Sequence, residues 1–203
     1  MLTAECSVLF MRIIAGKFRS RPLRSLQGAE LRPTSDRLRE TLFNVLTAAR
    51  AMEGTVWLDL FAGTGAVGIE ALSRGARKVY FAEAARKSVD LIGQNLRSLK
   101  IESGFQILQQ DAVAAVGKIT EALDICFLDP PYKMEEQYEK VLAALAKSSV
   151  LHENSVVIAE HSKHFDPKER YGRLERFRKL VQGDAVLSFY RLSNSAAINA
   201  DER

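Results

Sequence analysis

The chain has 203 residues, 47% of them hydrophobic and 27% charged, with a formal net charge of +4. This balance fits one globular domain and excludes a long disordered polymer. Charges interrupt every apolar stretch before the roughly eighteen residues that a membrane-spanning helix needs, and Cys6 and Cys126 are too far apart for a disulfide framework or a zinc motif. We therefore expect a cytoplasmic protein, monomeric by default, with no membrane partner and no metal site.

The first part of the chain, residues 1–34, is interpreted as a basic extension. Residues 1–10 carry no basic segment or cleavage site typical of a secretory signal; we expect them to be disordered, and Met11 is an alternative start to Met1. The following segment is rich in basic residues and holds no acid, which predicts a surface for a polyanion. Its basic residues are Arg12, Lys17, Arg19, Arg21 and Arg24.

Residues 35–50 have apolar side chains at helical spacing, which predicts an amphipathic helix capped by a serine or threonine after Pro33. Five short apolar runs then alternate with four helical stretches, an order typical of a parallel sheet with helices on both faces. The runs are 55–60, 78–84, 104–110, 124–130 and 155–161, and the helical stretches are 65–75, 85–100, 111–119 and 134–147. The only tryptophan, Trp57, lies in the first run and is expected in the core.

Two strand-like segments, 173–182 and 185–192, flank Gly183 and Asp184, and this pair predicts an antiparallel hairpin that closes the sheet. We therefore expect an α/β, doubly wound domain over residues 35–192, followed by a disordered tail at residues 193–203. A second basic cluster runs from Lys163 to Lys179. This cluster is either a surface for a polyanion or an ordinary solvated face, and the sequence does not decide between the two.

Acidic residues stand at the ends of four consecutive predicted strands, where open α/β sheets bind their ligands. They are Asp59, Glu83, Asp111 and Asp129. Carboxylates there would repel the pyrophosphate of a dinucleotide and attract a ligand with a sulfonium and an ammonium group. S-adenosylmethionine is such a ligand, and we expect it as the cofactor.

The turn after the first strand contains Gly63, Gly65 and Gly68, the G-x-G-x-x-G spacing that also fits dinucleotide-binding proteins. With adenosylmethionine as the ligand, Glu83 would accept hydrogen bonds from the ribose, and the glycine turn with Asp59 would hold the amino acid end. Asp111 and the Ala112 backbone would contact the adenine, although Asp111 could equally cap a helix. The predicted cofactor contacts from this part of the chain are Asp59, Phe61, Gly63, Gly65, Glu83, Ala84, Asp111, Ala112 and Asp129.

The fourth strand ends in Asp129-Pro130-Pro131-Tyr132. An exocyclic base amine is a weak nucleophile, because its lone pair is delocalised into the ring. Asp129 and the Pro130 carbonyl could each accept one amine N–H and so orient the nitrogen towards a methyl group. Tyr132 offers a face on which an extruded base can stack. We interpret Asp129, Pro130 and Tyr132 as the catalytic group.

These motifs, DLFAGTG and DPPY, resemble adenosylmethionine-dependent methyltransferases that act on exocyclic amines of nucleic acid bases. The upstream segments RIIAGKFRSRPL and LRPTSDRLRETLFNVL are similar to the bacterial 16S ribosomal RNA guanine-N2 methyltransferase family. The resemblance extends over nearly the whole chain, from Met11 to Leu192. It implies a Rossmann-like, doubly wound sheet of seven strands with an antiparallel last strand, and a small N-terminal hairpin-like extension that touches RNA.

The resemblance also implies that Thr34, Arg37 and Glu40 lie near the cofactor pocket, although Arg37 and Glu40 could instead form a solvated helix face. It implies that the family uses no metal, and His161 and His164 alone do not make a metal site. The implied substrate is one guanine of 16S rRNA, in a 30S particle or assembly intermediate. The predicted RNA-binding residues are Arg12, Lys17, Arg19, Arg21, Arg24 and Arg32.

Two alternatives remain. An adenine-N6 DNA methyltransferase shares the DPPY motif but would need a target-recognition region, and only about fifty residues lie outside the core. A non-catalytic RNA-binding ribosome assembly factor would be expected to have lost part of the site, whereas the glycine turn and DPPY are both intact here.

Overall fold

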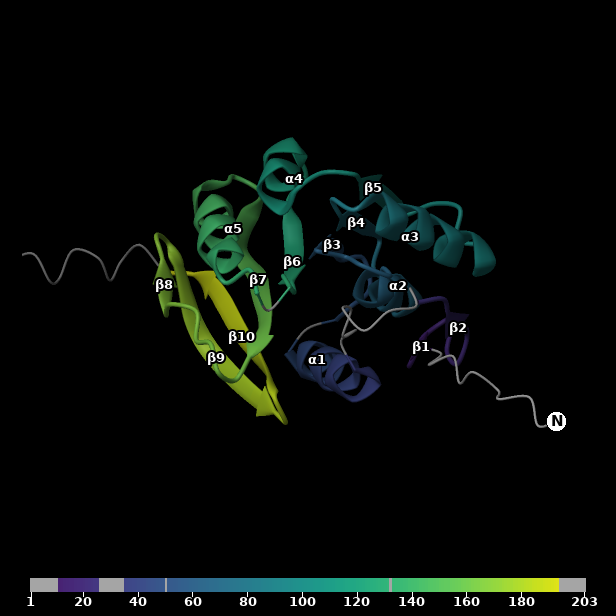
Figure 1. Ribbon diagram of the computed structural model, residues 1–203, viewed down its shortest axis with the longest axis horizontal. Helices are drawn as coiled ribbons and strands as arrows, with labels where there is room; N and C mark the ends of the chain where they lie inside the picture. Colours follow the sequence, from purple (N-terminus) through teal and green to yellow (C-terminus); the bar gives the residue numbers. More distant parts are fainter. Residues whose placement is uncertain (1–10, 26–34, 50, 132, 194–203) are drawn as a thin grey trace, which may run out of the picture.

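The computed structural model describes residues 11–25, 35–49, 51–131 and 133–193. Its centre is a sheet with strand order β5-β4-β3-β6-β7-β10-β9-β8 (Figure 1). The first five of these strands run parallel, and β10 lies antiparallel between β7 and β9. The strands are β3 (Val56–Leu60), β4 (Lys78–Ala82), β5 (Phe105–Leu108), β6 (Leu123–Leu128), β7 (Leu151–Ser162), β8 (Arg170–Tyr171), β9 (Leu174–Gln182) and β10 (Ala185–Leu192).

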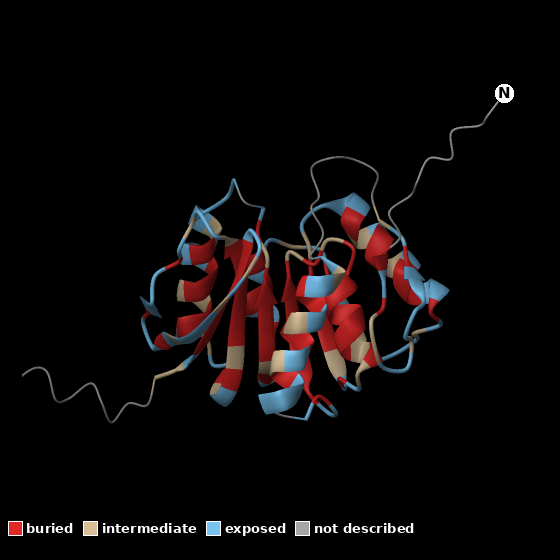
Figure 2. Ribbon diagram, turned by 90° about the horizontal axis from the view of Figure 1, so that it is seen from below, coloured by how far each residue is buried: buried red, intermediate tan, exposed pale blue. Residues whose placement is uncertain are grey.

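Helices cover both faces of the sheet. Trp57 and Phe127 point to the face covered by α1, α2 and α3, whereas Leu58 and Cys126 point to the face covered by α4 and α5. The helices are α1 (Asp36–Ala49), α2 (Ala66–Ser73), α3 (Arg86–Ser98), α4 (Ala112–Lys118) and α5 (Glu136–Lys147). Figure 2 shows the buried residues concentrated in the sheet and on the inner sides of the helices. The doubly wound α/β fold and the core position of Trp57 are confirmed.

The predicted elements agree with the observed ones except at their edges. Ser35 caps α1, because its hydroxyl oxygen accepts a hydrogen bond from the Leu38 N–H at 3.2 Å. Gly183, with φ of 63°, opens the two-residue turn of the β9–β10 hairpin. Strand β7 begins at Leu151 and so includes polar residues ahead of the predicted apolar run. The two-residue strand β8 adds an eighth strand to the seven that the family implies.

The N-terminal segment forms a short antiparallel hairpin of β1 (Met11–Arg12) and β2 (Pro22–Leu23). Its apolar side chains Met11, Ile13 and Leu23 are buried in the same core as α1, α2 and α3. The hairpin crosses α2 closely, since a Cβ at Gly16 would stand 1.9 Å from the Ser73 carbonyl oxygen. The hairpin is therefore packed against the sheet domain. The predicted tail begins with Ser193, whose N–H donates to the Arg173 carbonyl, and its remaining residues lie outside the described part of the chain.

No helix in the described segments has both the length and the apolar content to cross a membrane.

Candidate active site

The turn between β3 and α2 brings glycine backbone to the carboxyl edge of the sheet. Phe61, Gly63 and Gly65 have φ values of 60°, 54° and 77°, a left-handed conformation that glycine adopts without strain. A Cβ at Gly63 would have only the Phe61 carbonyl oxygen within 4 Å, at 3.8 Å, so a ligand can approach this backbone. A Cβ at Gly68 would stand 2.3 Å from the Phe81 ring, which explains the third glycine by close helix-to-strand packing.

Glu83 follows β4 directly and fixes the shape of this turn. One carboxylate oxygen accepts the Gly63 N–H at 3.0 Å, and the other accepts the Ala85 N–H at 2.8 Å. Each carboxylate oxygen has two lone pairs, which leaves acceptor capacity for hydroxyl groups of a ligand. The neighbouring Ala84 is exposed. The remaining acceptor capacity of Glu83 fits the ribose hydroxyls of adenosylmethionine, and the open glycine turn fits its amino acid end.

Asp59 lies inside β3 rather than after it, and its side chain is buried beneath the turn. Its Oδ2 accepts the Gly68 N–H at 2.9 Å. Burial raises the pKa of Asp59 to about 8, the charge of Glu83 adds to this shift, and the Gly68 hydrogen bond opposes it. The negative charge expected at Asp59 is therefore reduced near neutral pH until a cationic ligand stabilises the ionised form.

Asp111 is the N-cap of α4, and its Oδ1 accepts the Ala114 N–H at 2.9 Å. The capping alternative stated for Asp111 is thus observed. Asp111 is exposed and Ala112 is buried. Both residues follow β5, the strand next to β4, so the adenine contact predicted for them stays compatible with their position.

Asp129 and Pro130 follow β6, next to β3 and its glycine turn. Burial raises the pKa of Asp129 well above its ordinary value, and the charges of Glu160 and Asp59 raise it further. The Pro131 carbonyl accepts the Met134 N–H at 2.8 Å. In the described part of the chain, the Pro130 carbonyl receives no such hydrogen bond and keeps its acceptor capacity. Tyr132 lies outside the described residues.

Glu160 is an acidic residue at this edge that the sequence interpretation missed. It lies in β7, with a relative exposure of only 4%, one position after Ala159, which pairs in register with Leu128 of β6. Glu160 therefore stands beside Asp129. The sequence did offer a signal for it, because Glu160 is an acid inside the otherwise apolar run SVVIAEH.

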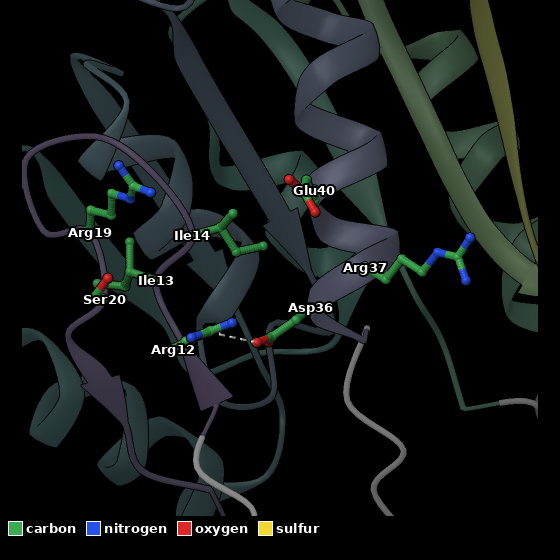
Figure 3. A pocket seen from close by; sticks show the side chains of 8 residues that line it. All are labelled: Arg12, Ile13, Ile14, Arg19, Ser20, Asp36, Arg37 and Glu40. Atoms are coloured by element: carbon green, nitrogen blue, oxygen red, sulfur yellow. Dashed lines mark ion pairs between the residues drawn. The ribbon is translucent and has the colours of Figure 1, made fainter.

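A pocket of about 420 Å³ lies between the N-terminal hairpin and the start of α1. Figure 3 shows Arg12 paired with Asp36, at 3.4 Å between Nε and Oδ2, and Arg37 pointing away from Arg12 and Arg19. No ion pair among the described residues joins Arg37 or Glu40 to the strand-end acids. The implied position of Arg37 and Glu40 near the cofactor stays a prediction, and Thr34 lies outside the described residues. The pocket is lined by Arg12, Ile13, Ile14, Arg19, Ser20, Asp36, Arg37 and Glu40.

A buried charge cluster joins the hairpin to α1 and α2, and it was not predicted. Glu70 accepts the N–H groups of Ile14 at 2.7 Å and Ala15 at 2.9 Å. The fully buried Arg39 lies 3.9 Å from the Glu70 carboxylate, and its Nη2 donates to the Arg12 carbonyl at 2.5 Å. These contacts fix where the basic hairpin lies on the domain.

The five predicted RNA-binding residues of the hairpin segment are all exposed. The sixth predicted residue, Arg32, lies outside the described residues. Arg24 Nη1 donates to Gln94 at 3.2 Å, and Arg21 Nη2 donates to the Ser98 carbonyl at 3.2 Å, so both lie along α3. The Lys17 N–H donates to the carbonyl of Ser73, the last residue of α2, at the opposite end of this helix from the glycine turn. The hairpin thus presents a basic stripe that extends away from the site.

The second basic cluster is largely neutralised by ion pairs. Arg176 contacts Asp166 at 2.6 Å and Glu169 at 3.4 Å, and Lys179 contacts Asp166 at 2.9 Å. These pairs favour the solvated-face interpretation of this cluster. His161 is buried between backbone and Ser188, at 2.9 Å from its hydroxyl, and the residues placed by the structure contain no group of three metal-ligating side chains.

Comparison with known proteins supports the resemblance found in the sequence. A family model named conserved hypothetical protein 95 matches residues 11–191. Ribosomal RNA small subunit methyltransferase D of Haemophilus influenzae is 36% identical over 156 residues, 75% of this chain and 79% of that protein. YlbH of Bacillus subtilis, described as a candidate rRNA methyltransferase, is 33% identical over 184 residues, 89% of this chain and 98% of that protein.

Solved structures agree with this relationship. The Escherichia coli protein yhhF, described as a candidate methyltransferase, has a TM-score of 0.79 at 28% identity, covering 91% of this chain and 98% of that chain. The methylase HI0767 of Haemophilus influenzae, described as a candidate, has a TM-score of 0.74 at 28% identity, and the match covers 91% of this chain and 99% of that chain. The chain therefore belongs to the conserved hypothetical protein 95 family and is a relative of the ribosomal RNA small subunit methyltransferases D.

Proposed function

We propose that this protein is an S-adenosylmethionine-dependent methyltransferase that modifies the exocyclic N2 amine of one guanine in 16S rRNA. The observation that carries the proposal is the end of β6, where the Asp129 carboxyl group and the Pro130 carbonyl, which accepts no backbone hydrogen bond from the described residues, follow one another beside the glycine turn. Relatives named as methyltransferases of small-subunit ribosomal RNA support the substrate class.

The cofactor would lie across the carboxyl ends of β3, β4 and β5. Glu83 would accept hydrogen bonds from its ribose hydroxyls, beside Ala84, and the turn from Phe61 to Gly65 would hold its amino acid end. Asp111 and the Ala112 N–H would contact its adenine, with Thr34 and Arg37 at the rim. When bound, adenosylmethionine supplies an electrophilic methyl group on a sulfonium.

Asp129 and Pro130 would act on the base. Each accepts one N–H of the exocyclic amine, which turns the nitrogen lone pair out of conjugation and towards the methyl group. The nitrogen becomes cationic on methylation and must lose a proton. Burial and the charges of Glu160 and Asp59 raise the pKa of Asp129. Once the cationic cofactor stabilises its ionised form, the Asp129 carboxylate would be basic enough to take that proton. Tyr132 would stack on the extruded base.

The basic hairpin would position the RNA. Its exposed arginines and Lys17 contact phosphates, which contributes affinity and register but no sequence reading. Recognition of one guanine then depends on RNA shape and on the base pocket. We propose a 30S particle or assembly intermediate as the substrate, in the cytoplasm, with the protein acting as a monomer.

The Asp129→Ala variant tests this proposal. We expect it to lower the formation of N2-methylguanosine by at least about 100-fold, the size of loss seen when one preorganised hydrogen-bonding group is removed from an active site, while adenosylmethionine binding measured by calorimetry changes little. Glu135→Ala, an exposed change beyond the same loop, is the matched control and should behave as the wild type. Retained turnover in Asp129→Ala would contradict the catalytic assignment.

A further inference from the structure

Glu160 is placed next to Asp129 by the register of two parallel strands. Phe127 of β6 pairs with Ile158 of β7, and both side chains lie in the core beneath α1, α2 and α3. Since side chains alternate along a strand, Asp129 and Glu160, each two positions further on, point to this same face at the carboxyl edge of the sheet. Asp59 of β3 also points to this face, because it pairs with Phe127.

The two carboxyl groups are close enough to influence one another. The charge of Glu160 is the second cause, after burial, of the raised pKa of Asp129. The backbone at Glu160 is held in place, because its carbonyl accepts the hydroxyl of the buried Tyr138 at 2.7 Å. Two carboxyl groups held side by side repel one another when both are ionised, which is why one raises the pKa of the other. A ligand edge with two adjacent hydrogen-bond donors could place one donor on each carboxyl group.

Guanine has such an edge. Its N2 amine and its N1–H are adjacent donors, whereas adenine has an N6 amine next to an N1 that is an acceptor. The two bases can be superposed so that the amine and N1 coincide. A site with one acceptor for the amine and a second acceptor for N1–H therefore accepts guanine, and it places a carboxylate against a lone pair when adenine enters.

We propose that Glu160 is the residue that selects guanine over adenine, by accepting the guanine N1–H while Asp129 and Pro130 hold the N2 amine. This inference rests on the proposed function and deepens it. The choice of base then depends on the hydrogen bond between Glu160 and N1–H, and the RNA contacts of the hairpin do not contribute to it. It also separates this site from amine methyltransferases that use the same Asp-Pro-Pro-Tyr sequence for adenine.

Glu160→Gln is the sharpest test, because the amide keeps the shape of the carboxylate and can donate an N–H to adenine N1. The substrates are small-subunit particles reconstituted with 16S transcripts that carry guanosine or adenosine at the position modified by the wild type. The readout is the ratio of kcat/KM for the two bases, with the methylated nucleoside identified by mass spectrometry. Glu153→Gln, an exposed change in the same strand, is the matched control.

We expect the wild type and Glu153→Gln to prefer guanosine by at least about 100-fold, as sites built around a substrate donor do, and Glu160→Gln to lower that preference at least tenfold. An unchanged preference, or an equal loss on both bases, would overturn the inference. A purely structural role for Glu160 would lower both activities without changing their ratio.

A second measurement needs no variant. 2-Aminopurine at the target position keeps the N2 amine but has an unprotonated N1, so wild-type kcat/KM should fall at least tenfold relative to guanosine. Equal turnover of the two bases would overturn the role of Glu160 as N1–H acceptor. If the wild type forms no N2-methylguanosine at all, it is the proposed function that fails. If the wild type forms N2-methylguanosine but the kcat/KM ratios between bases are unchanged, only the inference about Glu160 fails.

Discussion

The carboxylate of Glu83 holds the N–H of Gly63 at 3.0 Å and, through its other oxygen, the N–H of Ala85 at 2.8 Å. One side chain thus ties the glycine turn after β3 to the end of β4. The same carboxylate is the group that we expect to bind the ribose of the cofactor. If this assignment is right, the shape of the turn and the affinity for the ligand both depend on Glu83.

Glu83→Gln should weaken adenosylmethionine binding by about 5- to 100-fold. A glutamine has one acceptor oxygen and no charge, so the cofactor's ribose hydroxyls would lose charge-assisted hydrogen bonds worth about 1–3 kcal/mol. Calorimetric titration with adenosylmethionine measures the effect. The exposed change Glu102→Gln serves as the control and should leave the Kd unchanged. An unaltered Kd in Glu83→Gln would show that this carboxylate does not contact the cofactor.

The buried carboxyl group of Asp59 should make stability depend on pH. Its folded pKa is raised to about 8 from an ordinary value of 3.8, so between these values the folded state binds more protons than the unfolded state. The free energy of unfolding contributed by this group therefore falls as pH rises from about 4 to about 8 and levels off above that. Urea unfolding at pH 5, 6, 7 and 8 measures the slope.

Asp59→Asn should flatten that slope, because the asparagine oxygen still accepts the Gly68 N–H but does not titrate. The wild type and the variant should differ least at pH 5 and most at pH 8, where the variant is relatively more stable. Parallel curves for the two proteins would mean that Asp59 does not carry the raised pKa.

Arg39→Ala should destabilise the protein by about 2–4 kcal/mol, because it empties a fully buried site and removes the hydrogen bond to the Arg12 carbonyl. Glu70 keeps its ion pair with Arg74 at 2.7 Å, so its charge stays balanced in the variant. The N-terminal hairpin should lose protection in amide hydrogen exchange first, since Arg39 and Glu70 hold its backbone. For comparison, Arg86→Ala removes an exposed pair with Asp90 and should cost less than about 0.5 kcal/mol. Similar losses in both variants would contradict the anchoring role of Arg39.

Arg19→Gln should weaken RNA binding by removing one phosphate contact from the exposed hairpin. The slope of log K against log salt should decrease in magnitude by about one, measured by filter binding of 16S RNA at several salt concentrations. Arg170→Gln removes a charge that is already paired with Glu175 at 3.2 Å, and its slope should match the wild type. If Arg170→Gln has the larger effect, the RNA surface lies on the second basic cluster instead.

Local sequence patterns were sufficient for the elements and for the edge of the sheet at which the four predicted acids lie. Apolar runs and helical spacing indicated the alternation of strands and helices, and the acids meet at one edge because parallel strands end together. The acid inside the run SVVIAEH was visible in the sequence, but its pairing with Asp129 was not. Asp129 follows a different strand, β6, and only the register of β6 and β7 places the two residues side by side.

Long-range contacts also explain the other differences. Arg39 and Glu70 are both polar residues in helices, which a sequence pattern assigns to solvent, yet they are buried because the hairpin covers them. The two-residue strands β1, β2 and β8 are too short to produce a period-two pattern. They exist because neighbouring backbone is available for pairing.

The central claim is tested most directly by methyl transfer from labelled adenosylmethionine to unmodified 30S particles, naked 16S RNA and duplex DNA in parallel, with the product nucleoside identified. We predict label in N2-methylguanosine of the RNA, with more incorporation into the particle than into naked RNA. Label in N6-methyladenine of DNA would contradict the assignment of base and substrate, and binding of adenosylmethionine with no label in any substrate would contradict the assignment as an enzyme of these nucleic acids.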